Sequence, residues 1–143
     1  MTQPPVSRVS PAPPFGEPEG VARRRCIGVV DDDPSILRAV RRLLGTAGFS
    51  VLTFGSGEQF LACEALATID CLVLDIHLGG LNGFEVQERL ADLRPCLPIV
   101  FITAHDDQAT RERAHRGANS RYLRKPFEEQ ALVQAIRTVL GGA

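Results

Sequence analysis

The segment CIGVVDDDPSILRAVRRLL, residues 26–44, decides the fold of this chain. Its first five residues form a short apolar run that ends in acids, which is typical of a strand buried within a sheet. Asp33 and Pro34 then match a helix N-cap followed by a proline at the first helical position. Apolar residues continue at helical spacing to Ala47, and Gly48 closes the pattern. The segment therefore predicts a buried strand followed by an amphipathic helix.

The same alternation of strand and helix continues to the end of the chain. Further strands are predicted at 49–54, 71–75, 97–103 and 119–125, with 49–54 nearest an edge because it is the least apolar. Helices are predicted from Ser56 to about Leu66, with Phe60 and Leu61 inward, and at 83–93, 106–116 and 127–140. Glu128 and Glu129 are expected in the first turn of the last helix, where acids favour the helix dipole.

Five strand–helix units in one chain predict an α/β fold. Apolar strands with helices between them favour a parallel sheet with right-handed crossovers and helices on both faces. Units of this size indicate the flavodoxin-like, doubly wound order 2-1-3-4-5. We expect one domain over 23–143, with no second domain.

Composition excludes several classes of protein. The chain has 143 residues, 44% of them hydrophobic, and a formal net charge of −1. No apolar run approaches the ~18–20 residues of a membrane helix, and the balanced charge gives no argument for contact with nucleic acid or a membrane. The four cysteines lack metal-site spacing, so we expect free thiols, buried for Cys26, Cys71 and Cys96, in the reducing cytoplasm.

The N-terminal segment differs from the rest of the chain. Six of the ten prolines fall in the first 18 residues, and large apolar groups are few there. We expect 1–22 to be a disordered, proline-rich tail, because it cannot bury enough surface to offset the entropy of ordering. The segment lacks the apolar core of a secretory signal. Arg23–Arg25 are interpreted as a solvated flank, with a docking or nucleic-acid arm as the weaker alternative.

Polar side chains stand where the predicted strands end. The first strand is followed by Asp31 and Asp32, and the third ends at Asp75. Thr103 ends the fourth strand, and Lys125 ends the fifth. Because ligands of such folds bind outside the carboxyl ends of the strands, we expect these five side chains to converge at one rim.

The residue types at this rim indicate phosphoryl-transfer chemistry. Three neighbouring carboxylates repel unless a cation is present, and oxygen ligands select Mg²⁺ or Mn²⁺. Lys125 is the only lysine among 16 basic residues, which favours a need for a compact charge there, and a cis bond to Pro126 would aim it inward. Metal, lysine and hydroxyl can neutralise phosphoryl oxygens while an aspartate attacks. The sequence has no P-loop and no GxGxxG motif.

These stretches together resemble bacterial response-regulator receiver domains of two-component systems. The matching segments are CIGVVDDDPSILRAVRRLL, CLVLDIHLGGLNGFE, PIVFITAH and RYLRKPF, and the resemblance spans about residues 25–140. It implies that Asp31 and Asp32 hold Mg²⁺, with Asp32 the more direct ligand. Asp75 matches the phospho-acceptor, which takes its phosphoryl group from a sensor histidine kinase or phosphotransfer protein.

The resemblance also implies roles for the neighbouring positions. His77 matches the residue whose backbone carbonyl binds the metal, and Ala104 matches the small residue that leaves the phosphate reachable. Thr103 and Lys125 match the switch hydroxyl and the phosphate-binding lysine, and Tyr122 matches the aromatic switch position. One departure from the family pattern is Gly79-Gly80, where proline usually stands four residues after the acceptor; it predicts a more mobile loop.

Two further hypotheses concern regulation. Phosphorylation is expected to draw Thr103 toward Asp75 and let Tyr122 rotate into the space left behind. Helix 106–116 has almost no large apolar side chain, so the face over 106–140 is expected to carry the signal and possible homodimerisation. His77 and His105 are expected to border the entrance for hydrolytic water and to tune dephosphorylation near pH ~6.5.

The sequence therefore predicts a phosphorylation-dependent signalling switch and not an enzyme. Two alternatives stay open: a hydrolase that forms an aspartyl phosphate, and a degenerate receiver that only binds partners. The chain ends at Gly141-Gly142-Ala143, directly after the last predicted helix, and both a stand-alone receiver and a piece of a longer regulator fit that ending.

Overall fold

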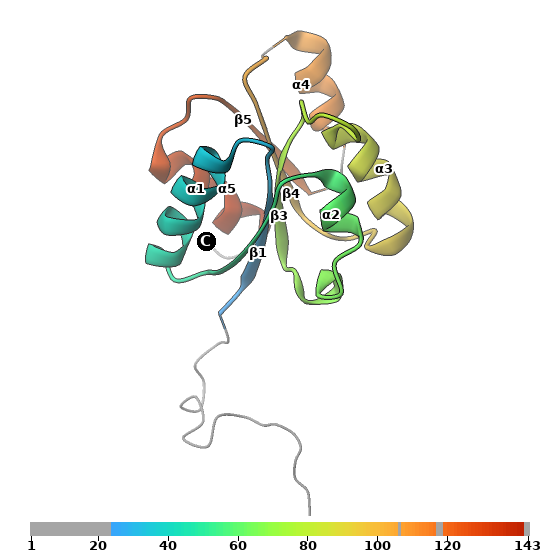
Figure 1. Cartoon of the computed structure of the whole chain (residues 1–143). Coiled ribbons are helices and arrows are strands. Elements are labelled where there is room, and N and C mark those ends of the chain that lie inside the picture. Colours follow the sequence, from blue (N-terminus) through green and yellow to red (C-terminus); the bar gives the residue numbers. More distant parts are fainter. Residues whose placement is uncertain (1–23, 106, 117–118, 142–143) are drawn as a thin grey trace, which may run out of the picture.

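Five parallel strands form the centre of the molecule in the computed structural model, which describes residues 24–105, 107–116 and 119–141 (Figure 1). The strand order is β2-β1-β3-β4-β5, so the predicted order is confirmed. The strands are β1 (Cys26–Val30), β2 (Ser50–Phe54), β3 (Cys71–Asp75), β4 (Ile99–Thr103) and β5 (Ser120–Arg124). The predicted tail, 1–22, lies outside the described residues.

Helices follow each strand and cover both faces of the sheet. They are α1 (Pro34–Thr46), α2 (Gly57–Leu61), α3 (Gly83–Leu93), α4 (Gln108–Ala114) and α5 (Glu129–Val139), with a short 3₁₀ helix, η1 (Leu66–Thr68), before β3. In Figure 1, α1 and α5 lie on one side of the sheet and α2, α3 and α4 on the other. The chain is therefore doubly wound, as the sequence predicts.

The core consists of two clusters, one on each face of the sheet. Alternate residues of β1, β3 and β4 point to opposite faces, and all five residues of β3 and of β4 are buried. One cluster joins the sheet to α1 and α5 through Val40, Leu44 and Ile136. The other joins it to α2 and α3 through Phe60 and Leu90. These two cores fix the central strands whose ends build the site.

The register of the strands brings the predicted site residues to the same edge. Val30 of β1 is paired with Leu74 of β3, so the next residues, Asp31 and Asp75, stand at the same level. Asp75 is paired with Ile102, directly before Thr103. All carboxyl ends of a parallel sheet point the same way, so these side chains share one rim.

The first helix confirms the prediction from residues 26–44 in detail. Asp33 is the N-cap, its carboxylate accepts the Ser35 N–H at 2.8 Å, and Pro34 opens the helix. Gly48 has φ +100°, a left-handed conformation that lets the chain turn from α1 into β2.

The second helix is shorter than predicted. Ser56 caps it as expected, but it ends at Leu61 instead of about Leu66. The chain then turns, with Cys63 Sγ accepting the Ala65 N–H, and passes through η1 to Asp70. The Asp70 N–H donates to the Cys26 carbonyl at 2.8 Å, so the segment must reach the sheet within a few residues. Competition from this local turn ends the helix early.

Other element boundaries differ by one or two residues at their ends. The strands predicted at 49–54, 97–103 and 119–125 are β2, β4 and β5 as bounded above, because Pro98 has no N–H and Phe49 belongs to the turn after α1. The helix predicted at 106–116 begins after Asp107, its N-cap, and Asp106 lies outside the described residues. Glu128 is the N-cap of α5 and not part of its first turn.

All four cysteines are free thiols, as predicted. Cys71 is buried in β3, and burial raises the pKa of its thiol to about 12. The expected burial of Cys96 is wrong, since Cys96 is exposed in the loop between α3 and β4, and Cys26 is only half-buried. Leu97, not Cys96, turns inward at this point.

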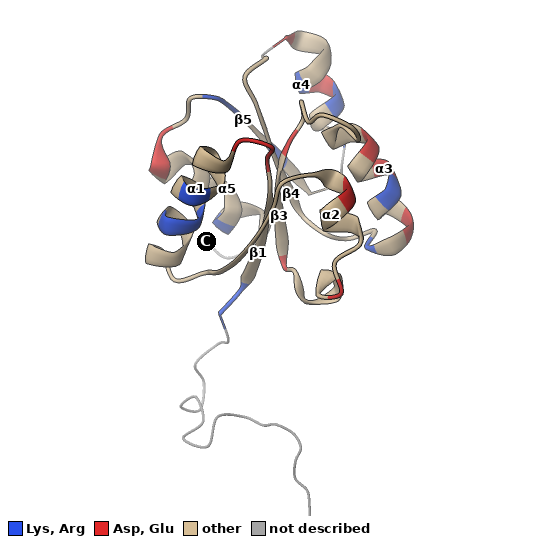
Figure 2. Cartoon of the chain, in the orientation of Figure 1, with Lys and Arg blue, Asp and Glu red and all other residues tan. Residues whose placement is uncertain are grey.

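Charged side chains are spread over the molecule with one concentration of acids. Figure 2 shows acidic residues at the loop between β1 and α1, and basic residues along α1. Among the described residues, no helix is both long and apolar enough to cross a membrane.

Candidate functional site

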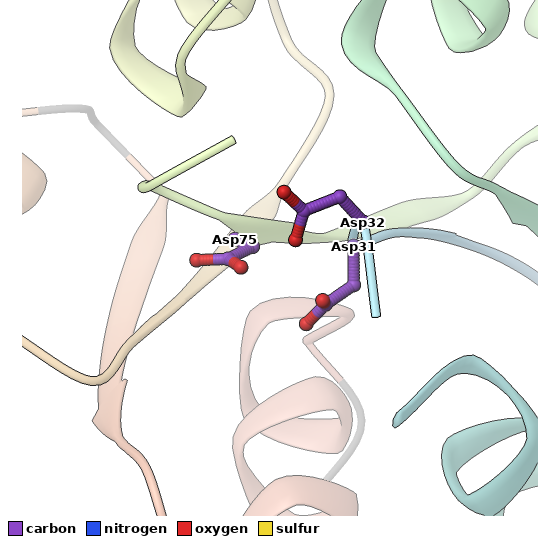
Figure 3. Close-up of side chains that lie close together, drawn as sticks. All are labelled: Asp31, Asp32 and Asp75. Carbon is purple, nitrogen blue, oxygen red and sulfur yellow. The ribbon is translucent and has the colours of Figure 1, made fainter. Parts of the chain in front are cut away.

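Three aspartates meet where β1 and β3 end. One carboxylate oxygen from each of Asp31, Asp32 and Asp75 lies within 4.8 Å of the others (Figure 3). Asp31 is fully buried, Asp75 is 4% exposed, and Asp32 is exposed. An all-oxygen cluster with one open side fits a hard divalent cation such as Mg²⁺, which keeps part of its water shell. The three aspartates that the sequence predicts around a cation therefore lie together.

Local hydrogen bonds hold the two buried carboxylates in place. Asp31 Oδ1 accepts the Asp33 N–H at 2.9 Å, and Asp75 Oδ1 accepts the His77 N–H at 3.0 Å. The Asp31 N–H donates to the Phe54 carbonyl at 3.1 Å, which anchors the loop to β2. Each buried acid therefore spends one oxygen on the backbone and keeps the other for the site.

Lys125 directly follows β5, the edge strand of the sheet, and reaches the cluster from there. Its Nζ donates to Asp31 Oδ2 at 2.8 Å and to Asp75 Oδ2 at 3.2 Å, and its side chain is 19% exposed. The Lys125 N–H donates to the Thr103 carbonyl at 2.7 Å, which fixes the stem of the side chain beside β4. The Lys125–Pro126 peptide bond is cis. The only lysine of the chain thus bridges the two buried acids.

The electrostatic surroundings oppose charge on Asp75 and favour charge on Lys125. Burial and the neighbouring Asp31 charge raise the pKa of Asp75, although the His77 N–H and Lys125 act in the other direction. Burial alone would lower the pKa of Lys125, but its hydrogen bond to Asp31 and the charges of both acids raise it. The site is therefore short of positive charge, a deficit that a divalent cation would relieve.

Thr103 and Ala104 complete the rim. Thr103 is fully buried, and its Oγ1 accepts the His105 N–H at 3.0 Å. Ala104 is exposed and lines, with Lys125, a cavity of about 420 Å³ between α1 and the start of α5. All five side chains that the sequence predicts at this rim stand at the carboxyl ends of their strands.

Comparisons with known proteins agree with this geometry. A family model described as the response regulator receiver domain matches residues 27–137. This chain belongs to that family. Receiver domains of two-component response regulators are signalling modules, and they interact with histidine kinases.

Relatives and solved structures of known source are similar over most of the chain. Nodulation protein W of Bradyrhizobium diazoefficiens is 40% identical over 108 residues, covering 76% of this chain and 48% of that protein. The response regulator TodT of Pseudomonas putida is 34% identical, covering 82% of this chain and 52% of that protein. The chain therefore spans about half the length of these relatives. A receiver protein structure from Burkholderia phymatum is 44% identical with a TM-score of 0.71, covering 84% and 98% of the two chains.

The loop that follows Asp75 in this receiver domain is held by residues that no motif in the sequence marks as functional. Glu58 of α2 accepts the Leu81 N–H at 3.3 Å, next to Gly80, whose φ is +84°. A Cβ on Gly83 would lie 2.8 Å from the Asp75 carbonyl oxygen. Gly83 directly follows Asn82, the N-cap of α3, and the capping box of Asn82 with Glu85 is the signal in the sequence that could have located this position.

The predicted switch residues lie on the β5 side of the receiver domain. Tyr122 is half-buried against the core, and its ring centroid is 6.2 Å from that of His115. Ala114 is the one buried residue of α4, as the scarcity of apolar residues predicts. Arg113 of α4 lies over the Phe84 ring at 4.4 Å and pairs with Glu88 at 3.4 Å, so α4 contacts α3 through a charged side chain.

The two histidines expected at the entrance are in contact. The rings of His77 and His105 are exposed and stand 4.3 Å apart between centroids. Their effect on dephosphorylation stays a prediction, as does the greater mobility of the Gly79-Gly80 loop.

Proposed function

We propose that this receiver domain is a phosphorylation-dependent switch whose acceptor is Asp75. The observation that carries the proposal is the contact of Lys125 Nζ with both Asp31 and Asp75, inside a cluster of three carboxylates. This combination supplies a nucleophilic oxygen, a fixed cationic donor and oxygen ligands for a divalent ion at one point. We propose the cytoplasm as the location, in agreement with the free thiols of the chain.

The proposed reaction moves a phosphoryl group from a phosphohistidine of a sensor histidine kinase or phosphotransfer protein to Asp75. An Asp75 carboxylate oxygen forms the new bond to phosphorus, the bond between phosphorus and the imidazole nitrogen breaks, and its electron pair stays on that nitrogen. No general base is needed, because the attacking carboxylate is already ionised. Lys125 stays close enough to donate to a phosphoryl oxygen once the acceptor is modified.

Mg²⁺ is the ion that fits the proposed role. Asp31, Asp32 and Asp75 would hold it through their side chains, and His77 would add its backbone carbonyl, as the family resemblance implies. When bound, the ion neutralises charge on the phosphoryl oxygens during transfer. In its absence, burial and the charge of the neighbouring Asp31 disfavour the charged form of Asp75, in agreement with its raised pKa.

The cavity beside Lys125 offers a surface for the phosphoryl donor. It is lined by apolar residues of α1 and of the segment that leads into α5, among them Ile36, Leu43 and Phe127. A partner helix seated there would lie next to the bridging lysine. We therefore propose that the kinase or phosphotransfer protein docks on this face.

The output is proposed to travel through Thr103 and Tyr122 to the face over 106–140. The Thr103 hydroxyl now accepts a backbone N–H, and turning toward a phosphorylated Asp75 would exchange that partner for a phosphoryl oxygen. Tyr122 lies on the neighbouring strand, paired with Phe101, and α4 has a single buried residue to hold it. A weakly packed helix is one that a small bias can move, which also makes this face a candidate for homodimerisation.

Labelling with acetyl phosphate tests the proposal without knowledge of the kinase. The wild-type chain should take up phosphate in Mg²⁺, and uptake should be lost in EDTA and in Asp75→Asn. Asp92→Asn, on the exposed surface of α3, is the matched control and should label normally. Labelling that persists in Asp75→Asn would remove Asp75 from its role, and rapid release of phosphate from many turnovers of small phosphoesters would favour a hydrolase instead.

A further inference from the structure

Two imidazole rings stand side by side next to the acidic cluster. The ring centroids of His77 and His105 are 4.3 Å apart, with an angle of 68° between the ring planes, and both side chains are exposed. His77 belongs to the loop after β3 and His105 to the loop after β4. Two separate loops thus bring two imidazole rings into contact.

The backbones of both histidines are fixed. The His77 N–H donates to Asp75 Oδ1 at 3.0 Å, and the His105 N–H donates to Thr103 Oγ1 at 3.0 Å. Each ring is therefore attached to a residue whose own position is set by a central, buried strand. Only side-chain rotations remain to be ordered when a ligand binds, which lowers the entropic cost of binding.

The separation of the rings suits a shared metal ion. Imidazole nitrogens bind ions such as Zn²⁺ at about 2.0–2.1 Å, so the centroids of two rings that bind one ion at a right angle lie roughly 4.5 Å apart. The observed separation is shorter by a few tenths of an ångström, within reach of small side-chain rotations.

Negative charge lies close to this pair. Asp107, the exposed N-cap of α4, interacts with His77, and that interaction contributes to a lowered pKa of Asp107 after the larger effect of the Thr110 N–H. The acidic cluster lies at the same rim. The surroundings therefore favour a cation over an anion between the rings.

We propose that His77 and His105 form a second metal site, which takes a borderline divalent transition ion such as Zn²⁺ or Ni²⁺ with water in the remaining positions. Imidazole ligands suit these ions, whereas Mg²⁺ prefers oxygen. The site differs in chemistry from the all-oxygen cluster, so saturating Mg²⁺ should occupy the cluster and leave the two imidazoles to the transition ion.

Calorimetric titration of the full chain with Ni²⁺, free of any affinity tag, tests this site. The protein carries Cys96→Ser so that the exposed thiol does not bind the ion. We expect one site that persists at saturating Mg²⁺ and whose affinity falls at least about tenfold in His77→Ala and in His105→Ala. His115→Ala removes the third histidine of the chain and is the matched control, which should bind as the parent does.

A second variant separates the pair from the acidic cluster. Asp32→Asn removes an exposed carboxylate of the cluster, and Ni²⁺ binding should survive it. Unchanged binding in the double variant His77→Ala/His105→Ala, or loss of binding in Asp32→Asn or in excess Mg²⁺, would overturn the proposal. Repeating the titration with Zn²⁺ should give the same order of variants.

Discussion

Asp75 is a carboxylate in surroundings that oppose its charge. Burial and the charge of Asp31 raise its pKa above the ordinary value of 3.8. The folded state therefore holds the proton more tightly than the unfolded state does. The free energy of unfolding falls as pH rises from 3.8 through the raised pKa, and the loss is complete once Asp75 is ionised. The proposed acceptor is thus a residue whose charge destabilises the metal-free fold.

The raised pKa of Asp75 gives a prediction for the stability of Asp75→Asn. In EDTA at neutral pH the variant should be more stable than the wild type, by on the order of 1 kcal/mol. The difference should shrink as pH falls toward 3.8, because the wild-type carboxyl is then protonated in both states. Urea denaturation at several pH values measures it. A variant that is less stable than the wild type at neutral pH would contradict the assignment of charge to Asp75.

The contacts that Lys125 makes with both buried acids require a lysine side chain. One Nζ atom donates to two carboxylates, at 2.8 and 3.2 Å, which a planar guanidinium cannot reproduce from the same stem. In Lys125→Arg we expect the rate of acetyl phosphate labelling to fall at least about tenfold with the far-UV circular dichroism unchanged. Arg124→Lys, at the neighbouring exposed position, is the control and should label at the wild-type rate. Equal labelling of Lys125→Arg would show that any cation suffices.

At the scale of single residues, the sequence predicts which chemical groups form the site better than it predicts how deeply each group is buried. Acids, a hydroxyl and a lysine at strand ends were readable, since strand ends of a parallel sheet share an edge. The different environments of the acids could not be predicted, because they depend on burial. Asp31 is fully buried, whereas the adjacent Asp32 is exposed. Cys96 was misplaced for the same reason, because an apolar run does not reveal where its strand begins.

The start of α3 sets the position of the loop that follows Asp75. A Cβ on Gly83 would lie 2.8 Å from the Asp75 carbonyl oxygen and 2.8 Å from Ile76 Cα, both backbone atoms that cannot move aside cheaply. Gly83→Ala should therefore cost about 2–3 kcal/mol of stability and weaken Mg²⁺-dependent labelling, because the loop must shift away from the cluster.

A second glycine provides the matched control for that variant. Gly45 in α1 has open space around its Cβ position, so Gly45→Ala should stabilise the protein by about 0.5–1 kcal/mol through helix propensity alone. Thermal denaturation compares the two. Equal, small effects would mean that the close approach at Gly83 does not constrain the loop.

Elements with a cap and a regular apolar period were predictable, and elements ended by local turns were not. Asp33-Pro34 and Asn82 mark the starts of α1 and α3 because their side chains bond the first helical amides. The end of α2 at Leu61 depends on a local hydrogen bond from the Ala65 N–H to Cys63 Sγ and on the tertiary pairing of Asp70 with Cys26. No residue type in the segment after Leu61 predicts that turn.

At the scale of the whole molecule, the proposed switch has a built-in reporter. Tyr122 is the only tyrosine, and the chain contains no tryptophan. If phosphorylation rotates Tyr122 from its half-buried place, the intrinsic fluorescence must change when acetyl phosphate and Mg²⁺ are added. Asp75→Asn should show no change under the same conditions. A labelled wild-type protein with constant tyrosine emission would separate phosphorylation from movement of Tyr122.

The proposed donor cavity and the proposed output face share the start of α5 and otherwise involve different helices. The face with α1 carries the cavity next to Lys125, where the donor is proposed to dock. The other face carries α4, which contacts α3 through Arg113. The order of the sheet was predictable from the alternation of elements, because crossover handedness and burial leave few topologies. The contact of Arg113 with Phe84 was not predictable, because the two residues lie on different helices and no sequence pattern links them.

The position of the phosphoryl group tests the central claim most directly. After treatment with acetyl phosphate and Mg²⁺, borohydride reduction converts an aspartyl phosphate to homoserine, and peptide mass spectrometry locates it. We predict homoserine at position 75 alone, and none in samples treated in EDTA. Homoserine at position 31 or 32, or none at 75 in protein that has taken up phosphate, would contradict the account.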